Sequence, residues 1–202
     1  NKLYYIGWNS GTTTYRMSLI MGLALENENN FSRYSRAPLF EKTNKEPFGI
    51  LTAPYVIKDK EHYKMWYVSG EGWINQNLPK YNIKYAESKD GINWKREAHI
   101  AIDLLENETA LARPCVIKSD MYEMYFSYKD PKIGYRIGYA TSENGLEWKR
   151  HNNHSFNLDT STSGWDSEMV EYSFVFDHKG TRFMLYNGNN YGENGIGYAV
   201  WE

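Results

Sequence analysis

Paired cysteines, long apolar runs and a surplus of charge of either sign are all missing from this sequence of 202 residues. Cys115 is the single cysteine, which excludes an internal disulfide framework. No run reaches the roughly 18 apolar residues of a membrane-spanning helix. The formal net charge of −2 is unfavourable for non-specific nucleic-acid binding, which needs excess lysine and arginine. We therefore expect a soluble, cytoplasmic protein with no nucleic-acid or membrane partner, although a start at Asn1 leaves a removed leader or an upstream segment open.

Aromatic residues are abundant instead: 18 tyrosines, 8 phenylalanines and 7 tryptophans make up 16% of the chain. Such residues favour pleated, half-buried surfaces, and the rings of tyrosine and tryptophan also stack on flat ligands such as sugars. No segment of useful length shows the roughly 3.6-residue period of an amphipathic helix. The composition and the missing helical period together predict an all-β protein.

Three short patterns recur in the same order along the chain, which is typical of a repeat architecture. Each repeat begins with an apolar strand and continues with an aromatic strand. A third strand follows, which contains Gly-Tyr-Ala, Lys-Tyr-Ala or Gly-Leu-Ala. The apolar strand occurs at 52–58, 112–118 and 171–177, the aromatic strand at 2–6, 63–67, 122–126 and 182–186, and the third strand at 21–24, 83–86, 137–140 and 196–199.

Two of the third strands lead into matching hairpins, at 87–96 and 141–150. Asp90-Gly91 and Asn144-Gly145 predict tight turns, because such dipeptides supply the positive φ angles that these turns need. A tryptophan follows each turn and would cap the returning strand. The repeat unit therefore holds four strands joined by hairpins.

A four-stranded unit of this size cannot bury both of its faces alone, and stacking such units around an axis gives a β-propeller. The alternative, a β-sandwich, predicts no repeated strand order. We predict one propeller domain over residues 1–202, with blades at about 1–47 (partial), 48–107, 108–165 and 166–202 (partial). This ring of about four blades is incomplete. Either the sequence is a C-terminal fragment, or a second chain completes the blades, as in a homo-oligomer.

The segment richest in potential catalytic groups is Gly164–Glu171. It carries the carboxyl groups of Asp166, Glu168 and Glu171 at the entry to an apolar strand. Glycoside cleavage requires paired carboxyl groups, one to protonate the leaving oxygen and one to activate water or to attack directly. A solvated acidic loop is the alternative for this segment, more so for Asp166 than for Glu171. The residues that align with Glu171 in the other repeats are Thr52 and Ala112, so the blade itself does not require a carboxylate there.

Other candidate residues fall at the same predicted face, where the loops into the first strands and the loops between second and third strands gather. Two tryptophans follow second strands in glycine-flanked loops and could stack on a sugar. Two arginines could bind a carboxylate or phosphate of an acidic sugar, or form salt bridges with nearby acids. The candidate substrate-binding residues are Trp8, Trp73, Arg113, Arg136, Trp165, Asn189 and Tyr191. The histidines show no metal-ligand spacing, so we expect no metal and no cofactor.

The repeat order, the Trp-bearing hairpins and the strand at 171–176 resemble the five-bladed propeller glycosidases of families 43, 32, 62, 68 and 130. The similarity is closer to uncharacterised glycosidase-like proteins of bacterial surface-polysaccharide gene clusters, with shared runs at 5–9, 112–114 and 164–169. This resemblance implies the last four of five blades and a general-acid role for Glu171. The family pattern has Asp directly before the Pro of a blade's first strand. Ala53 and Arg113 stand there in this chain, and the usual carrier of the catalytic base would precede Asn1.

The sequence therefore predicts a glycosidase-like propeller that binds an oligosaccharide or polysaccharide at its loop face and cleaves it with Glu171 as acid. Glu168 or Asp166 would be the second carboxylate. Two alternatives stay open: a carbohydrate-binding module without catalysis, and a propeller that binds a protein partner through exposed strand edges.

Overall fold

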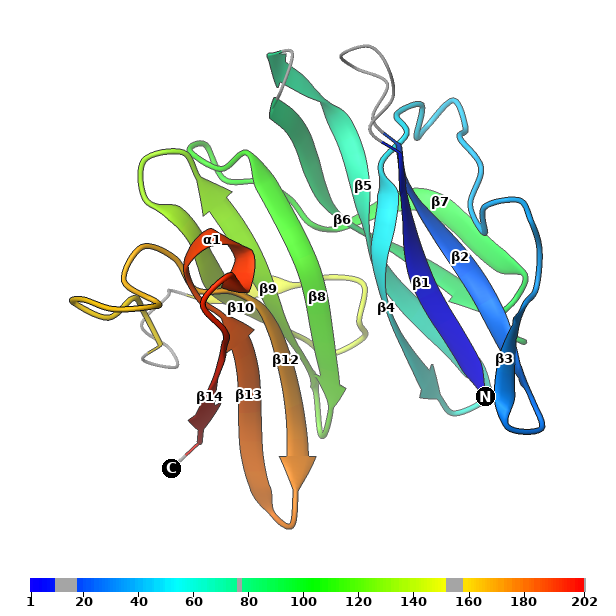
Figure 1. The fold of residues 1–202 in the computed structure, drawn as a ribbon. Helices are drawn as coiled ribbons and strands as arrows, with labels where there is room; N and C mark the ends of the chain where they lie inside the picture. The colour runs from blue at the N-terminus through cyan, green and yellow to red at the C-terminus, as the bar shows by residue number, and fades with distance from the viewer. Residues whose placement is uncertain (10–17, 76–77, 152–157, 202) are drawn as a thin grey trace. The chain divides into compact units, whose positions relative to one another are not determined.

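The computed structural model describes residues 1–9, 18–75, 78–151 and 158–201, and almost all of its regular structure is antiparallel β-strand (Figure 1). This confirms the predicted all-β fold. The chain divides into two compact units, Asn1–Ile100 and Ala101–Glu202. In the parts of the chain described, no helix is both long enough and apolar enough to cross a membrane.

The first unit contains two runs of consecutive, antiparallel strands. One run is β1 (Lys2–Asn9), β2 (Ser18–Asn27) and β3 (Asn30–Arg33). The other is β4 (Leu51–Asp59), β5 (His62–Asn75) and β6 (Leu78–Ser88), with β7 (Trp94–Ile102) paired on β6. A buried cluster between the runs includes Met21, Leu51 and Met65, because both faces of these strands are covered.

The second unit repeats this organisation. It contains β8 (Ala110–Lys118), β9 (Tyr122–Asp130), β10 (Gly134–Ser142) and β11 (Lys149–His151), paired in chain order. It then continues with β12 (Glu171–His178), β13 (Thr181–Asn187) and β14 (Ile196–Val200). A single helical turn, α1 (Asn189–Gly192), lies between β13 and β14 (Figure 1). Each run of strands places its successive members side by side, as the propeller repeat predicts.

The first strand of three repeats carries the same irregularity. Strand pairing shifts between Thr52 and Tyr55, between Ala112 and Cys115, and between Glu171 and Phe174. The residue inside each shift has a left-handed backbone, with φ of 46° at Ala53, 50° at Arg113 and 55° at Tyr172. Bulges of this kind redirect side chains, and strained left-handed residues concentrate at functional sites. The N-terminal part of each of these three strands therefore turns particular side chains out of the regular pleat.

Two sequence predictions about connections are wrong in detail. The hairpins after β6 and β10 are not two-residue turns, because β7 begins only at Trp94 and β11 only at Lys149. Gly91 and Gly145 have positive φ, of 69° and 79°, but Asp90 and Asn144 do not. Instead, the side chain of Asp90 accepts hydrogen bonds from the backbone N–H groups of Ile92 and Asn93, which holds a wider connection.

The glycine-flanked segments at Trp8 and Trp73 are strand, where the sequence predicts loops. Trp8 lies in β1 opposite Leu19, and Trp73 lies in β5 opposite Pro79. β5 and β6 continue far beyond the other hairpins, because two register shifts near Gly70–Asn75 absorb the irregular residues without ending the pairing. The two tryptophans are thus positioned by strand register and not by loop conformation.

Candidate functional site

Glu171 is the first residue of β12 and lies opposite Asn187 of β13, directly before the bulge at Tyr172. Its side chain is 0% exposed, and neither carboxyl oxygen has a hydrogen-bond partner among the described residues. Buried polar groups are nearly always paired, so an unpaired one needs an explanation. Within the described part of the chain, the carboxyl group is therefore available to accept a hydrogen bond from a ligand or to donate one to it.

The charge state of Glu171 follows from its surroundings. Burial raises the pKa of its carboxyl group from 4.5 to about 7, while the nearby charges of Lys129 and then Arg113 act in the opposite direction. Burial penalises the ionised form because it removes water from the charge. At neutral pH the group can consequently both hold and release a proton, as a general acid must.

The two cations near Glu171 lie against aromatic rings. The Arg113 guanidinium is 5.3 Å from the centre of the Tyr172 ring, and the Lys129 ammonium is 5.3 Å from the centre of the Tyr135 ring. Arg113 is exposed and sits at the bulge of β8, whereas Lys129 lies near the end of β9. The rings position the positive groups and leave their N–H donors available.

Three tyrosines form one aromatic group beside these cations. The ring centres of Tyr135 and Tyr172 are 5.7 Å apart, and Tyr191 lies 6.1 Å from Tyr135 and 6.2 Å from Tyr172. Tyr191 is 55% exposed and stacks on Tyr172 with an interplanar angle of 27°. Its backbone is left-handed, with φ of 62°, and its carbonyl accepts a hydrogen bond from the Asn187 side chain at 3.0 Å. An exposed ring held in this way suits stacking on a flat ligand.

Asn189 and Arg136 hold the segment before β12 in place. The side-chain oxygen of Asn189 accepts hydrogen bonds from the backbone N–H groups of Glu168, at 2.8 Å, and Met169, at 3.2 Å. Arg136 donates to the carbonyl of Glu168 at 2.9 Å and forms a 3.0 Å ion pair with Asp159. The polar groups of both side chains are thus engaged within the protein.

Asp166 and Trp165 are tied to β13. Asp166 is 6% exposed and accepts a 3.2 Å hydrogen bond from the Tyr186 hydroxyl, and the pKa of Tyr186 is raised by burial and by this carboxylate. Trp165 stacks on Tyr186 at 5.5 Å between ring centres and closely covers Gly188 and Gly197. Trp165 therefore packs on the sheet, and Asp166 has an internal partner.

Glu168 is exposed, and within the described ranges its hydrogen bonds come from its backbone. In the second unit, the structure thus brings Glu171 and Arg113 into electrostatic range, and connects Arg113 to Tyr191 through Tyr172. It joins Glu168, Asn189 and Arg136 through the backbone of one loop. Trp165 and Asp166 form a separate contact with Tyr186.

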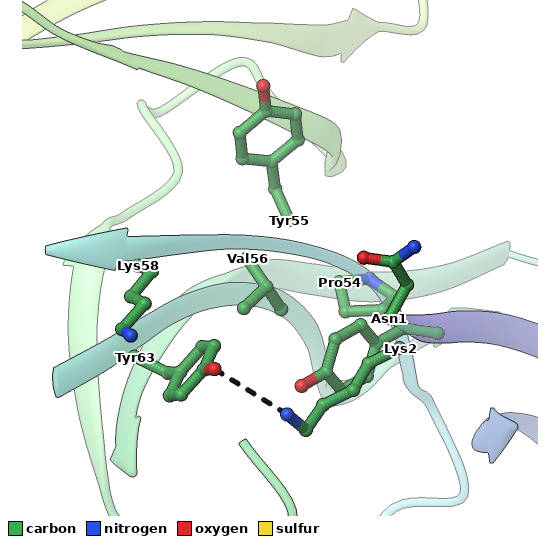
Figure 2. Close-up of a pocket in the computed structure, with 8 residues that line it drawn as sticks. Asn1, Lys2, Pro54, Tyr55, Val56, Lys58 and Tyr63 are labelled. Atoms are coloured by element: carbon green, nitrogen blue, oxygen red, sulfur yellow. Dashed lines mark hydrogen bonds between the residues drawn. The ribbon is translucent and has the colours of Figure 1, made fainter. Parts of the chain in front are cut away.

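The remaining predicted residues belong to the first unit. Trp8 is 67% exposed and Trp73 is half-buried. A pocket of about 430 Å³ in this unit contains neither of them (Figure 2). Figure 2 shows the Lys2 ammonium pointing toward the Tyr63 hydroxyl, at 3.5 Å. The pocket is lined by Asn1, Lys2, Tyr4, Pro54, Tyr55, Val56, Lys58 and Tyr63.

Sequence reasoning missed Lys129, Tyr135 and Tyr172 as site residues. A signal for Tyr172 was present, because it follows Glu171 at the repeat position that Ala53 and Arg113 occupy. The lysine and Tyr135 become visible only through strand register, since Lys129 pairs with Tyr135 across β9 and β10.

Solved structures similar to this chain include proteins with glycosidase names. A structure named "Glycoside hydrolase" matches with a TM-score of 0.76 and 21% identity, over 100% of this chain and 62% of that one. A glycosyl hydrolase from Bacteroides ovatus gives 0.69 and 19%, over 100% and 63%. A complex of BT0996 and RGII gives 0.73 and 20%, over 98% and 61%. This chain spans about three fifths of each, and the similarities to the glycoside hydrolases confirm the propeller glycosidase fold that the resemblance implied.

No protein-family model matches the chain. Two relatives from Mycobacterium tuberculosis strains, "Uncharacterized protein MT1551" and "Uncharacterized protein Rv1502", are each 40% identical over 204 residues. The alignment covers 99% of this chain and 67% of each relative. With that identity and coverage, the chain belongs to the same family as these two mycobacterial proteins, and it has the fold of the propeller glycosidases.

Proposed function

We propose that this chain binds an oligosaccharide or polysaccharide around Glu171 and takes part in cleaving a glycosidic bond. The observation that carries the proposal is the buried Glu171 carboxyl group, whose two oxygens have no partner among the described residues. A pKa of about 7 lets this group donate its proton to a leaving glycosidic oxygen near neutral pH.

The stacking surface for a sugar would be the tyrosine group, in which Tyr191 is the exposed ring. Since Glu171 has no exposed surface, a ligand reaches its carboxyl group only when a neighbouring side chain moves. Arg113 is an exposed side chain in that neighbourhood and is held by a ring contact and not by an ion pair to a described carboxylate. It is the natural group to move.

A second carboxylate is needed to attack or to activate water. Glu168 and Asp166 are the candidates in this segment. Asp166 accepts a hydrogen bond from Tyr186, whereas the exposed Glu168 carboxylate is fixed only through its backbone. Glu168 is therefore the better placed of the two to respond to a bound ligand.

A carbohydrate-binding role without cleavage is the second candidate. The observation that favours it is Arg113 at the bulge of β8, where the resemblance leads us to expect an aspartate. A guanidinium cannot serve as base or nucleophile, so this position contributes binding and no proton transfer.

Glu171→Gln separates the two roles. Gln keeps the shape of the side chain but cannot donate a proton as an acid. If Glu171 is the general acid, hydrolysis of polysaccharide or aryl-glycoside substrates falls by about 10²–10⁴-fold, while binding of the same sugars measured by calorimetry changes little. Glu147→Gln, at an exposed hairpin position, is the matched control. Equal turnover in all three proteins would rule out the acid role. Sugar binding without turnover in any of them would favour the binding module.

A further inference from the structure

Arg113 and Lys129 are cations of the second unit that both act through their charge on the Glu171 carboxyl group. The other arginines there each contact a carboxylate: Arg136 pairs with Asp159, Arg150 with Glu108, and Arg182 with Glu123 and Asp177. Arg113 and Lys129 form no ion pair with any carboxylate in the described parts of the chain, and their aromatic contacts are with Tyr172 and Tyr135. Two positive charges that act on the same carboxyl group thus have no ion-pair partner among the described residues.

Glu171 is in electrostatic range of both, and it is a poor counter-ion because burial favours its neutral form. Charges that are neither neutralised nor fully hydrated favour an anion from solution. The guanidinium of Arg113 offers a planar fork of donors that matches a carboxylate or a phosphate, and the ring of Tyr172 supports its flat face.

We propose that the saccharide bound at this site is anionic, and that Arg113 and Lys129 bind its carboxylate or phosphate group beside Glu171. The inference rests on the proposed function and adds the substrate class. The exposed ring of Tyr191 would stack on the sugar ring that carries the charge.

Charge balance also makes this arrangement consistent with acid catalysis. An anionic group placed between the two cations and Glu171 would neutralise the positive field that favours ionisation of Glu171. The bound ligand would then help the carboxyl group to retain its proton until transfer. A neutral sugar would leave both cations uncompensated and would gain nothing from them.

The test is binding to a glycan array whose members differ only in the acidic group: glucose against glucuronate, galactose against galacturonate, and mannose against mannose 6-phosphate. We expect the chain to bind at least one acidic member, with its neutral counterpart weaker by about tenfold or more. Arg113→Gln and Lys129→Gln should each reduce that difference, and Arg113→Lys should keep part of it. Lys149→Gln, at an exposed position of β11, is the charge-matched control and should leave it unchanged.

The outcomes separate the two proposals. A preference for uronates identifies a carboxylate, and a preference for the sugar phosphate identifies a phosphate; each supports the inference. Equal binding of neutral and acidic members overturns the inference and leaves the proposed function in place. Binding of inorganic phosphate as tight as that of mannose 6-phosphate identifies an ion site and overturns it too. No binding to any member overturns both.

Discussion

Arg113 and Tyr172 occupy the same position in two consecutive repeats, and the guanidinium of one lies 5.3 Å from the ring centre of the other. Both have a left-handed backbone at the bulge of a first strand, with φ of 50° and 55°. The bulges of β8 and β12 thus bring Arg113 and Tyr172 into a cation–π contact next to Glu171. A structural feature of the blade is, in this way, also what positions the candidate site.

Glu171 should make stability depend on pH. Its pKa is about 7 in the folded chain and 4.5 ordinarily, so the folded state holds this proton more tightly. The resulting stabilisation is complete below about pH 4.5 and is lost as pH rises toward 7 and beyond. Its size is about 3 kcal/mol. The variant Glu171→Gln has no carboxyl group to titrate at this position. Raising the pH across this range should therefore lower the unfolding free energy of the wild type relative to that of the variant.

Chemical denaturation at several pH values from about 4 to about 8 measures that difference directly. The matched control is Glu168→Gln, because Glu168 is exposed and lies in the same segment. A flat difference for Glu171→Gln across the whole range would mean that its carboxyl group keeps its ordinary pKa.

The cations near Glu171 should set where this transition falls. Lys129 and Arg113 both lower the pKa of Glu171 against the effect of burial, and Lys129 does so more strongly. Lys129→Gln and Arg113→Gln should therefore move the pH transition in stability upward, Lys129→Gln by more. Lys149→Gln should not move it. A downward shift in either variant would show that the lysine or arginine does not act on Glu171 through its charge.

The repeat pattern was sufficient to predict the strand order, because each blade reuses the same alternation of apolar and aromatic strands. It also placed Glu171 at the start of a first strand and singled it out against Thr52 and Ala112. These features depend on local sequence and on pairing between neighbouring strands, which a repeat makes visible.

The rest depends on contacts that the repeat does not encode. Trp165 is a predicted substrate-binding residue, but its packing on Tyr186 requires knowledge of which residues β13 presents to it. Asn189 is another, and its hydrogen bonds to the Glu168–Met169 backbone form only once α1 reverses the chain. The glycines of the long β5–β6 hairpin resemble turn residues in the sequence, whereas they lie at register shifts within paired strands.

A double-mutant cycle can test whether Trp165 packs on the sheet or is instead available to contact a ligand. A Cβ atom on Gly197 would overlap the Trp165 ring, so Gly197→Ala should cost about 1–3 kcal/mol of stability. In a Trp165→Ala background the same substitution should cost less, because the Trp165 ring is gone and only the Tyr186 ring, 3.0 Å from the added Cβ, still obstructs it. Thermal or denaturant unfolding of the four proteins completes the cycle. If the two substitutions prove additive, Trp165 does not rest on Gly197, and a role in sugar stacking gains support.

The segments 94–96 and 148–150 have the same sequence, Trp-Lys-Arg, and the arginine of each makes a similar stabilising contact. Arg150 forms a bidentate pair with the buried Glu108, at 2.6 and 2.9 Å, and lies over the Phe126 ring. Arg96 contacts the buried Glu46 and lies over Phe40 in the same way.

Arg150→Met should destabilise the chain by about 3 kcal/mol, because it leaves the Glu108 charge buried without its cation. Lys45→Met is the control, since Lys45 and Glu97 form an ion pair with both side chains more than 60% exposed. That loss should be much smaller, because water screens an exposed ion pair. Adding Glu108→Gln to Arg150→Met should recover part of the stability, since it removes the unpaired charge. The absence of any recovery would mean that Arg150 stabilises the blade through its packing on Phe126 and not through the ion pair.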